Sequence, residues 1–243
     1  MNESRETIHT EKHVKVGGLL KEAVFGFNDG LVSTLAVIAG LTGGFVEQKT
    51  VLLAALATLT AGAFSMGLGT YLGSKSEREL YESERKRELF EMKHMPEIER
   101  QEIYDIYSAK GFKGKLLDEV VAHIVNDPKL WLETMMREEL GFAEAPPKPG
   151  MNGIIMSISF VVGSTIPTAS YFFNNNSRVM IDGLGTLPFL FLISLVASCT
   201  GLLLAGILKT YFTKKNIFAS ALESLIVGVL AAAGTYGVGI LLS

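Results

Sequence analysis

Seven residues near the middle of this sequence have the types and spacing of a metal site built by helices. Their carboxylates come in pairs three residues apart, and two methionines stand three and four residues before the last carboxylate. Carboxylates that face one another from several helices bind metal, and thioether sulfur favours a softer divalent ion such as iron(II). The residues are Glu88, Glu91, Glu99, Glu102, Met135, Met136 and Glu139.

A second group of chemically active side chains lies in or beside apolar stretches. Asp29 lies in the first stretch, and Glu22 precedes it by seven residues and so shares its helix face. Met66 adds a soft sulfur to the second stretch, and Glu223 lies in the last. An ionised group at mid-membrane costs about 2.5–3.5 kcal/mol on insertion scales, so these residues predict an ion pathway. The structural alternatives are hydrogen bonding for Asp29, a membrane-surface position for Glu22 and Glu223, and packing for Met66.

Five apolar stretches are long enough to cross a membrane as helices, which takes about 20 residues. Strands of an outer-membrane barrel are excluded because they are shorter and alternate in polarity. Pro167 and Pro188 fall inside the third and fourth stretches and predict kinks there. The stretches lie at about 23–44, 50–73, 151–173, 184–208 and 217–242.

Charge sets the expected orientation, because most charged residues lie between Lys75 and Lys148. With the N-terminus and this insert in the cytosol, only Lys49 and Arg178 of the 22 basic residues face outward. The C-terminus then faces away from the cytosol. The expected domains are a cytosolic N-terminal segment, transmembrane helices one and two, a cytosolic metal-binding domain, and transmembrane helices three to five. Their bounds are 1–22, 23–74, 75–148 and 149–243.

The insert has the turn signals of three helices. The first continues the second span through residues 77–93, and Pro96 begins the second, at 96–109. The third covers residues 116–140, with an interruption at 126–128 and an end at Gly141. The predicted fold is therefore an all-α integral membrane protein, with five transmembrane helices and a three-helix cytosolic metal-binding insert between spans two and three.

Three separated runs of this sequence resemble motifs of the vacuolar iron transporter family. They are FGFNDGLVS at 25–33, AGAFSMGLG at 61–69 with Tyr71 following, and MMREELG at 135–141. The resemblance extends from Glu22 to the final span, and it includes the order of two spans, an acidic insert and three more spans.

This resemblance implies a homodimer of five-span subunits that exchanges cytosolic iron(II) for protons. It assigns metal collection to the seven residues of the insert, and it places a transport pathway along Asp29, Met66 and Glu22. Thr58 belongs to that pathway but departs from the family, which commonly has a glutamate there. A hydroxyl is a weaker, neutral ligand and cannot carry the exchanged proton.

The sequence thus predicts a transporter, and no enzyme, that moves Fe2+ out of the cytosol. Mn2+, Zn2+ and Co2+ are further ions that the same ligands could bind, and no organic cofactor is expected. The expected partners are the metal ions, protons, the lipid bilayer and a second copy of the chain. Nucleic acid is not expected, because no basic patch lies outside the spans. Short termini and compact loops favour a prokaryotic plasma membrane over a vacuolar membrane.

Two alternative functions remain at this stage. The first is a membrane-anchored metal sensor or chaperone without transport. The second is a ferroxidase-like protein, since Glu91 and His94 have the Glu-x-x-His spacing of di-iron helix bundles. No second such pair occurs, because Val120 stands three residues before His123, and oxidase activity is therefore the weaker hypothesis.

Overall fold

The computed structural model describes residues 17–173, 177–181, 185–213 and 216–243. The chain divides into two compact units, which we call the membrane unit (up to Thr70, and Met151–Ser243) and the inserted unit (Tyr71–Gly150). Of the N-terminal segment expected at 1–22, residues 1–16 lie outside the described part of the chain.

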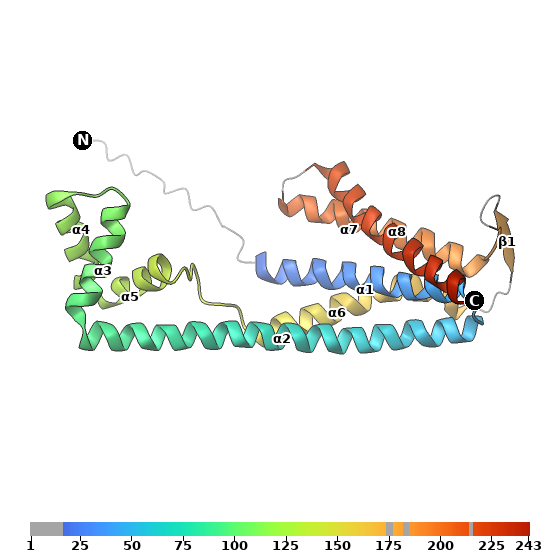
Figure 1. Cartoon of the computed structure of the whole chain (residues 1–243), viewed down its shortest axis with the longest axis horizontal. Helices are drawn as coiled ribbons and strands as arrows, with labels where there is room; N and C mark the ends of the chain where they lie inside the picture. Colours follow the sequence, from blue (N-terminus) through green and yellow to red (C-terminus); the bar gives the residue numbers. More distant parts are fainter. Residues whose placement is uncertain (1–16, 174–176, 182–184, 214–215) are drawn as a thin grey trace, which may run out of the picture. The chain divides into compact units, whose positions relative to one another are not determined.

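Within the described ranges, five helices are long and apolar enough to cross a membrane, which agrees with the number of spans expected from the sequence (Figure 1). The longest of them has 47 residues and continues from the membrane unit into the inserted unit, as expected. A short 3-10 turn, η2 (Ser170–Phe172), follows the third spanning helix. The five helices are α1 (Gly17–Gly43), α2 (Gln48–His94), α6 (Pro149–Ala169), α7 (Phe189–Thr213) and α8 (Ile217–Leu242).

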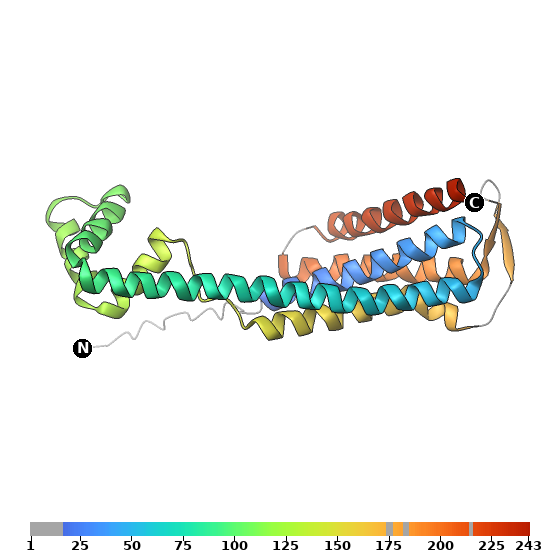
Figure 2. The same ribbon diagram turned by 60° about the horizontal axis from the view of Figure 1, so that its bottom comes forward.

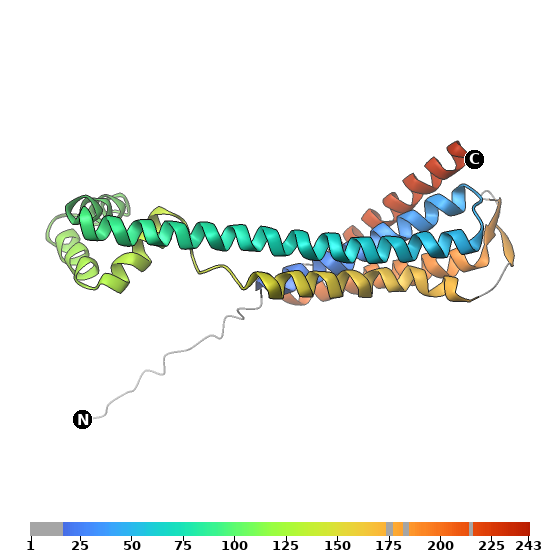
Figure 3. The same ribbon diagram turned by 90° about the horizontal axis from the view of Figure 1, so that it is seen from below.

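Helix α1 packs against α7 and α8, which also contact each other (Figure 2). It also packs against α6, where the Ser164 hydroxyl donates to the Gly30 carbonyl at 3.0 Å. Helix α6 in turn runs beside the membrane part of α2, where the Ser157 hydroxyl donates to the Ala63 carbonyl at 2.9 Å (Figure 3). These side-chain bonds to main-chain carbonyls join the spans without placing a charge between them.

Glycine makes the contact between α1 and α6 possible. A Cβ atom built on Gly30 would lie 2.2 Å from the Phe160 carbonyl oxygen, and one on Gly163 would lie 2.1 Å from that of Phe27. Such distances are impossible for any residue with a side chain, so the two backbones meet directly.

Buried apolar side chains fill the end of the membrane unit that holds the turn between α1 and α2. They come from all the spans except α6, whose continuation η2 contributes instead, and from the strand before α7. The cluster consists of Leu35, Ile38, Ala39, Val51, Ala55, Tyr171, Leu187, Leu190, Phe191 and Ala232.

The fourth span begins later than the sequence suggested, and Pro188 lies before it instead of kinking it. Strand β1 (Arg178–Ile181) pairs antiparallel with β2 (Gly185–Pro188), with Arg178 opposite Pro188. Proline disfavours a helical conformation in the residue before it, so α7 starts only at Phe189. The Phe189 amide then donates to the Ser177 carbonyl at 2.9 Å. Pro167, by contrast, lies inside α6 as expected.

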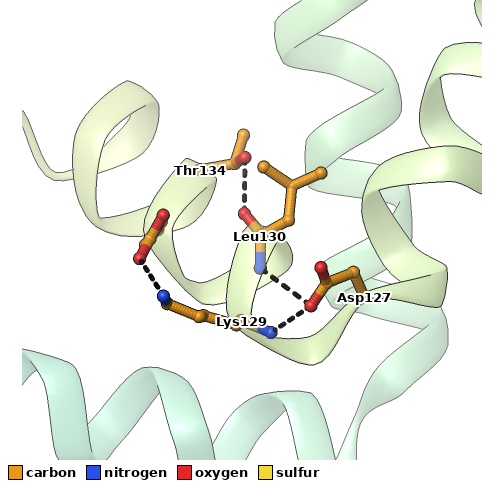
Figure 4. Close-up of polar contacts among 5 residues, drawn as sticks. Asp127, Lys129, Leu130 and Thr134 are labelled. Carbon is orange, nitrogen blue, oxygen red and sulfur yellow. Dashed lines mark hydrogen bonds and ion pairs between the residues drawn. The ribbon is translucent and has the colours of Figure 1, made fainter.

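The inserted unit contains the second part of α2 and three further helices, α3 (Pro96–Ala109), α4 (Gly114–Asn126) and α5 (Pro128–Thr134). The third helix expected from the sequence is thus divided at Asp127. The Asp127 carboxylate caps α5 by accepting from the amides of Lys129 at 2.9 Å and Leu130 at 3.3 Å (Figure 4). Pro128 suits the first turn, where its missing amide proton costs nothing.

A π turn, η1 (Met135–Glu139), follows α5 directly. The Leu140 amide donates to the Met135 carbonyl, five residues back, at 3.3 Å. Gly141 ends the turn at a φ of 75°, a conformation that suits glycine. The apolar core of the inserted unit is formed by Ile103, Leu117, Val121, Ile124, Trp131 and Met135.

Candidate functional site

The acidic residues expected in the metal site come from α2, α3 and η1 of the inserted unit. Two of them are almost completely buried, since Glu88 is 1% exposed and Glu99 3% exposed. Glu91 and Glu102 are half-buried, and Glu139 is exposed. Two carboxylates that are shielded from solvent are rare in a helical domain this small, because burying a charge is costly unless a cation accompanies it.

These carboxylates lie close enough to repel one another. Burial, and then the charges of Glu139 and Glu91, raises the pKa of Glu88 to about 7. Burial, and then the charges of Glu102, Glu88, Glu91 and Glu139, raises the pKa of Glu99 to about 7. Glu139 follows the same pattern, because partial burial of its carboxyl and then the charge of Glu102 raise its pKa. The three helical segments therefore converge on one negatively charged region.

Glu138, the neighbour of Glu139, shows the opposite behaviour. It forms a hydrogen-bonded ion pair with Lys110, and that hydrogen bond lowers its pKa. The adjacent glutamates thus have different roles, and Glu139 is the one that belongs to the acidic region.

Each of the two buried glutamates keeps one oxygen without a hydrogen bond. Oε2 of Glu88 and Oε2 of Glu99 are both enclosed, and neither has a hydrogen-bond partner among the described residues. Buried oxygens of this kind normally bind water or an ion, because leaving them bare costs about 1–3 kcal/mol. The donor set expected from the sequence, carboxylate oxygen with methionine sulfur, suits a divalent transition metal.

The carboxylates are gathered but do not form a closed set of ligands. Within the described ranges, no three His, Cys, Asp or Glu side chains meet closely enough to hold one metal ion. Arg87 of α2 instead contacts three carboxylates, at 2.9 Å from Glu84 and 3.6 Å from each of Glu88 and Glu91. Sequence reasoning missed both Arg87 and Glu84. The signal was their spacing, since the three glutamates stand three before, one after and four after the arginine.

Both methionines of η1 are buried, Met135 fully and Met136 at 4% exposure. Met135 packs in the apolar core with Trp131, so it has a structural role in addition to any ligand role. The π turn gives these two residues and Glu139 a local geometry that an α-helical reading of the sequence does not contain.

The membrane unit holds the residues expected along the transport pathway. Glu22, Asp29, Thr58 and Met66 are all half-buried. The Thr58 hydroxyl donates to the Ala54 carbonyl of its own helix at 2.8 Å. Among the described residues, no hydrogen bond or ion pair joins these four side chains to one another.

Glu223 lies on the exposed side of α8, with its side chain 68% exposed. Its carboxylate lies 3.6 Å from the Lys209 ammonium of α7. Glu223 therefore has a cationic neighbour on the adjacent helix.

The chain was compared with known families and proteins. The model of the VIT family matches residues 20–240. Vacuolar iron transporter 1 of Oryza sativa subsp. japonica is 36% identical over 231 residues, which cover 94% of this chain and 87% of that protein. Vacuolar iron transporter 1 of Arabidopsis thaliana is 33% identical over 229 residues, which cover 94% of this chain and 88% of that protein. The vacuolar iron transporter of Toxoplasma gondii (strain ATCC 50861 / VEG) is 33% identical over 239 residues, which cover 96% of this chain and 78% of that protein.

These comparisons bear on two expectations. The relatives are eukaryotic proteins whose names include the word vacuolar, so they give no support to the expected preference for a prokaryotic plasma membrane. They are named as transporters and not as enzymes, which agrees with the multi-pass membrane architecture. Since the family model covers all five spans and the inserted unit, this chain belongs to the VIT family.

Proposed function

We propose that this protein moves iron(II) out of the cytosol in exchange for protons, with the inserted unit gathering the metal on the cytosolic side. The observation that carries the proposal is the convergence of carboxylates from α2, α3 and η1. Two of these carboxylates are buried, each with an oxygen that has no hydrogen-bond partner among the described residues. The names of the relatives support iron as the substrate.

Metal collection falls to the seven residues of the inserted unit. Burial and the neighbouring carboxylates raise the pKa of Glu88 and of Glu99 to about 7, so both hold their protons more firmly than an ordinary carboxyl does. A divalent ion must displace those protons to bind, so metal uptake and proton release are linked at this step. The seven proposed ligands are Glu88, Glu91, Glu99, Glu102, Met135, Met136 and Glu139.

The proposed pathway through the membrane uses Asp29 and Met66 as ligands and Glu22 as an acidic residue at its cytosolic end. Thr58 lines this pathway without a charge, and its proton is already donated to the Ala54 carbonyl. Proton exchange within the membrane therefore falls to Asp29 and Glu22. The functional molecule in this proposal is a homodimer, with the N-terminus and the inserted unit in the cytosol.

The decisive experiment uses the full-length protein in sealed proteoliposomes under anaerobic conditions. Iron(II) is supplied on the face that carries the inserted unit, and dyes on the opposite face report metal and pH. We expect iron to enter and protons to leave together, and Mn2+, Zn2+ and Co2+ in parallel assays define the selectivity.

The matched variants are Asp29→Asn, in the pathway, and Glu133→Gln, which removes an exposed carboxylate elsewhere in the chain. Metal binding without movement of either ion would refute transport and leave a membrane-anchored sensor. Oxygen consumption with iron(II) would indicate the ferroxidase alternative. The structure gives that alternative little support, because His94 is exposed and its ring stacks on that of Phe90, with the two ring centroids 4.0 Å apart.

A further inference from the structure

Arg87 is a cation with three glutamates of α2 arranged around it. Each nitrogen of its guanidinium faces a different carboxylate. Nη1 lies 2.9 Å from Glu84, Nη2 lies 3.6 Å from Glu88, and Nε lies 3.6 Å from Glu91. A planar guanidinium with donors on all its sides can serve several carboxylates at once, which a lysine ammonium does less well.

This arrangement differs from the other ion pairs that join residues four apart along the helices of the inserted unit. Those pairs join one base to one acid four residues later, and both side chains are exposed. Arg87, in contrast, has three partners, and one of them is 1% exposed. The ordinary pairs are Lys75–Glu79, Arg78–Glu82, Lys115–Glu119 and Lys129–Glu133.

Exposure decides which partner in this cluster can move. The Arg87 side chain is 50% exposed, so it can turn into solvent at little cost. Glu88 is fixed in the interior, and without a cation its charge would be uncompensated. A divalent ion arriving at Glu88 and Glu91 would therefore meet Arg87 as a competitor for the same oxygens.

We propose that Arg87 is a displaceable counter-ion: its guanidinium compensates Glu88 and Glu91 in the metal-free protein, turns outward when a divalent cation binds, and returns when the cation leaves. This inference rests on the proposed role of these glutamates in metal collection. Its consequence is a weakened affinity, since a divalent ion must first displace the guanidinium from the carboxylates that it binds. A lower affinity favours release of the metal ion, and a site that passes its metal ion onward requires such release.

The test measures metal affinity of the full-length protein in detergent at pH 8, with Mn2+ as a probe that does not oxidise readily. Binding is followed by calorimetry and by the fluorescence of Trp131, the only tryptophan of the chain, which lies in the core of the inserted unit. The variants are Arg87→Gln and Arg87→Lys. The control is Arg85→Gln, which removes the same charge from an exposed position of the same helix.

We expect Arg87→Gln to bind Mn2+ about three- to tenfold more tightly than the unmodified protein, because a divalent ion then has no guanidinium to displace from the carboxylates. Arg87→Lys should lie between the two, and Arg85→Gln should change the Kd by less than about twofold. Damage to the fold would weaken binding, so tighter binding by Arg87→Gln cannot arise from such damage.

An unchanged or weaker affinity in Arg87→Gln, with Arg85→Gln unaffected, would overturn the counter-ion role. A Glu88→Gln variant separates this failure from a failure of the proposed function. If Glu88→Gln reduces Mn2+ binding while Arg87→Gln leaves it unchanged, metal collection stands and only the role of Arg87 is refuted. If Mn2+ does not bind at all, or if Glu88→Gln has no effect, both proposals fall.

Discussion

Replacing Glu88 by glutamine should make the metal-free inserted unit more stable at alkaline pH and leave it nearly unchanged at pH 5. The variant keeps the shape of the side chain and removes its ionisation. In the folded protein, burial and the charges of Glu139 and Glu91 raise the pKa of Glu88 to about 7, from 4.5 when unperturbed. Ionisation is therefore less favourable in the folded chain than in the unfolded one.

The sign of the effect follows from this shift. A raised carboxyl pKa contributes stability that is complete below the unfolded value of 4.5, and this contribution is lost as the pH rises through about 7. The shift corresponds to about 3 kcal/mol of unfolding free energy by pH 8. For a unit of this size, such a change moves the melting temperature by about 10 °C or more.

The assay is thermal unfolding of the full-length protein with a chelator present, followed by the fluorescence of Trp131. This tryptophan is 7% exposed and lies in the core of the inserted unit, so its signal reports that unit and not the spans. The control is Glu133→Gln, since Glu133 is 65% exposed and pairs only loosely with Lys129, at 3.8 Å.

We expect the melting temperature of the unmodified protein to decrease when the pH is raised from 5 to 8. The melting temperature of Glu88→Gln should decrease much less. Iron(II) or Mn2+ at pH 8 should restore the unmodified protein, because a bound cation compensates the ionised carboxylates. The reasoning is wrong if Glu88→Gln and Glu133→Gln follow the unmodified protein equally at both pH values.

Three further predictions concern the membrane unit. Asp29→Ala should abolish iron transport in proteoliposomes while calorimetry still detects metal binding by the inserted unit, and retained transport would remove Asp29 from the pathway. Gly163→Ala should lower thermal stability in detergent by about 1–3 kcal/mol, because the new Cβ would lie 2.1 Å from the Phe27 carbonyl oxygen. Gly234→Ala, with nothing within 4 Å, is its control and should be nearly neutral. Thr58→Glu should increase the number of protons exchanged per metal ion, measured as the ratio of dye signals, and an unchanged ratio would place Thr58 outside the proton route.

The spans and most helix limits of the insert could be predicted because they depend on local chemistry. Length and hydropathy identify a membrane-crossing helix, and proline and glycine mark where α3 begins and where η1 ends. The start of α7 was misjudged because Leu187 and Pro188 are apolar enough to extend the span. Leu187 and Pro188 pair instead with residues of β1, and a hydropathy average carries no information about such pairing.

The candidate site was only partly predictable for a different reason. Residue type and spacing identify Glu88 and Glu99, but nothing local indicates that both are buried while Glu84 and Glu91 keep some exposure. Burial is a property of the packing of three helices, and it raises the pKa values. Arg87 was overlooked because bases three or four residues from glutamates are typical of any solvated helix.

The π turn at Met135–Glu139 makes the angular register of the site depend on the length of one short segment. A chain that lacked only Arg137 would keep all seven proposed ligands. It could return to regular α-helical hydrogen bonds, and Glu139 would then follow Met135 by three residues instead of four. The inventory of ligands and their register are thus separate properties of the chain. Only the register decides whether a single metal ion can reach them all.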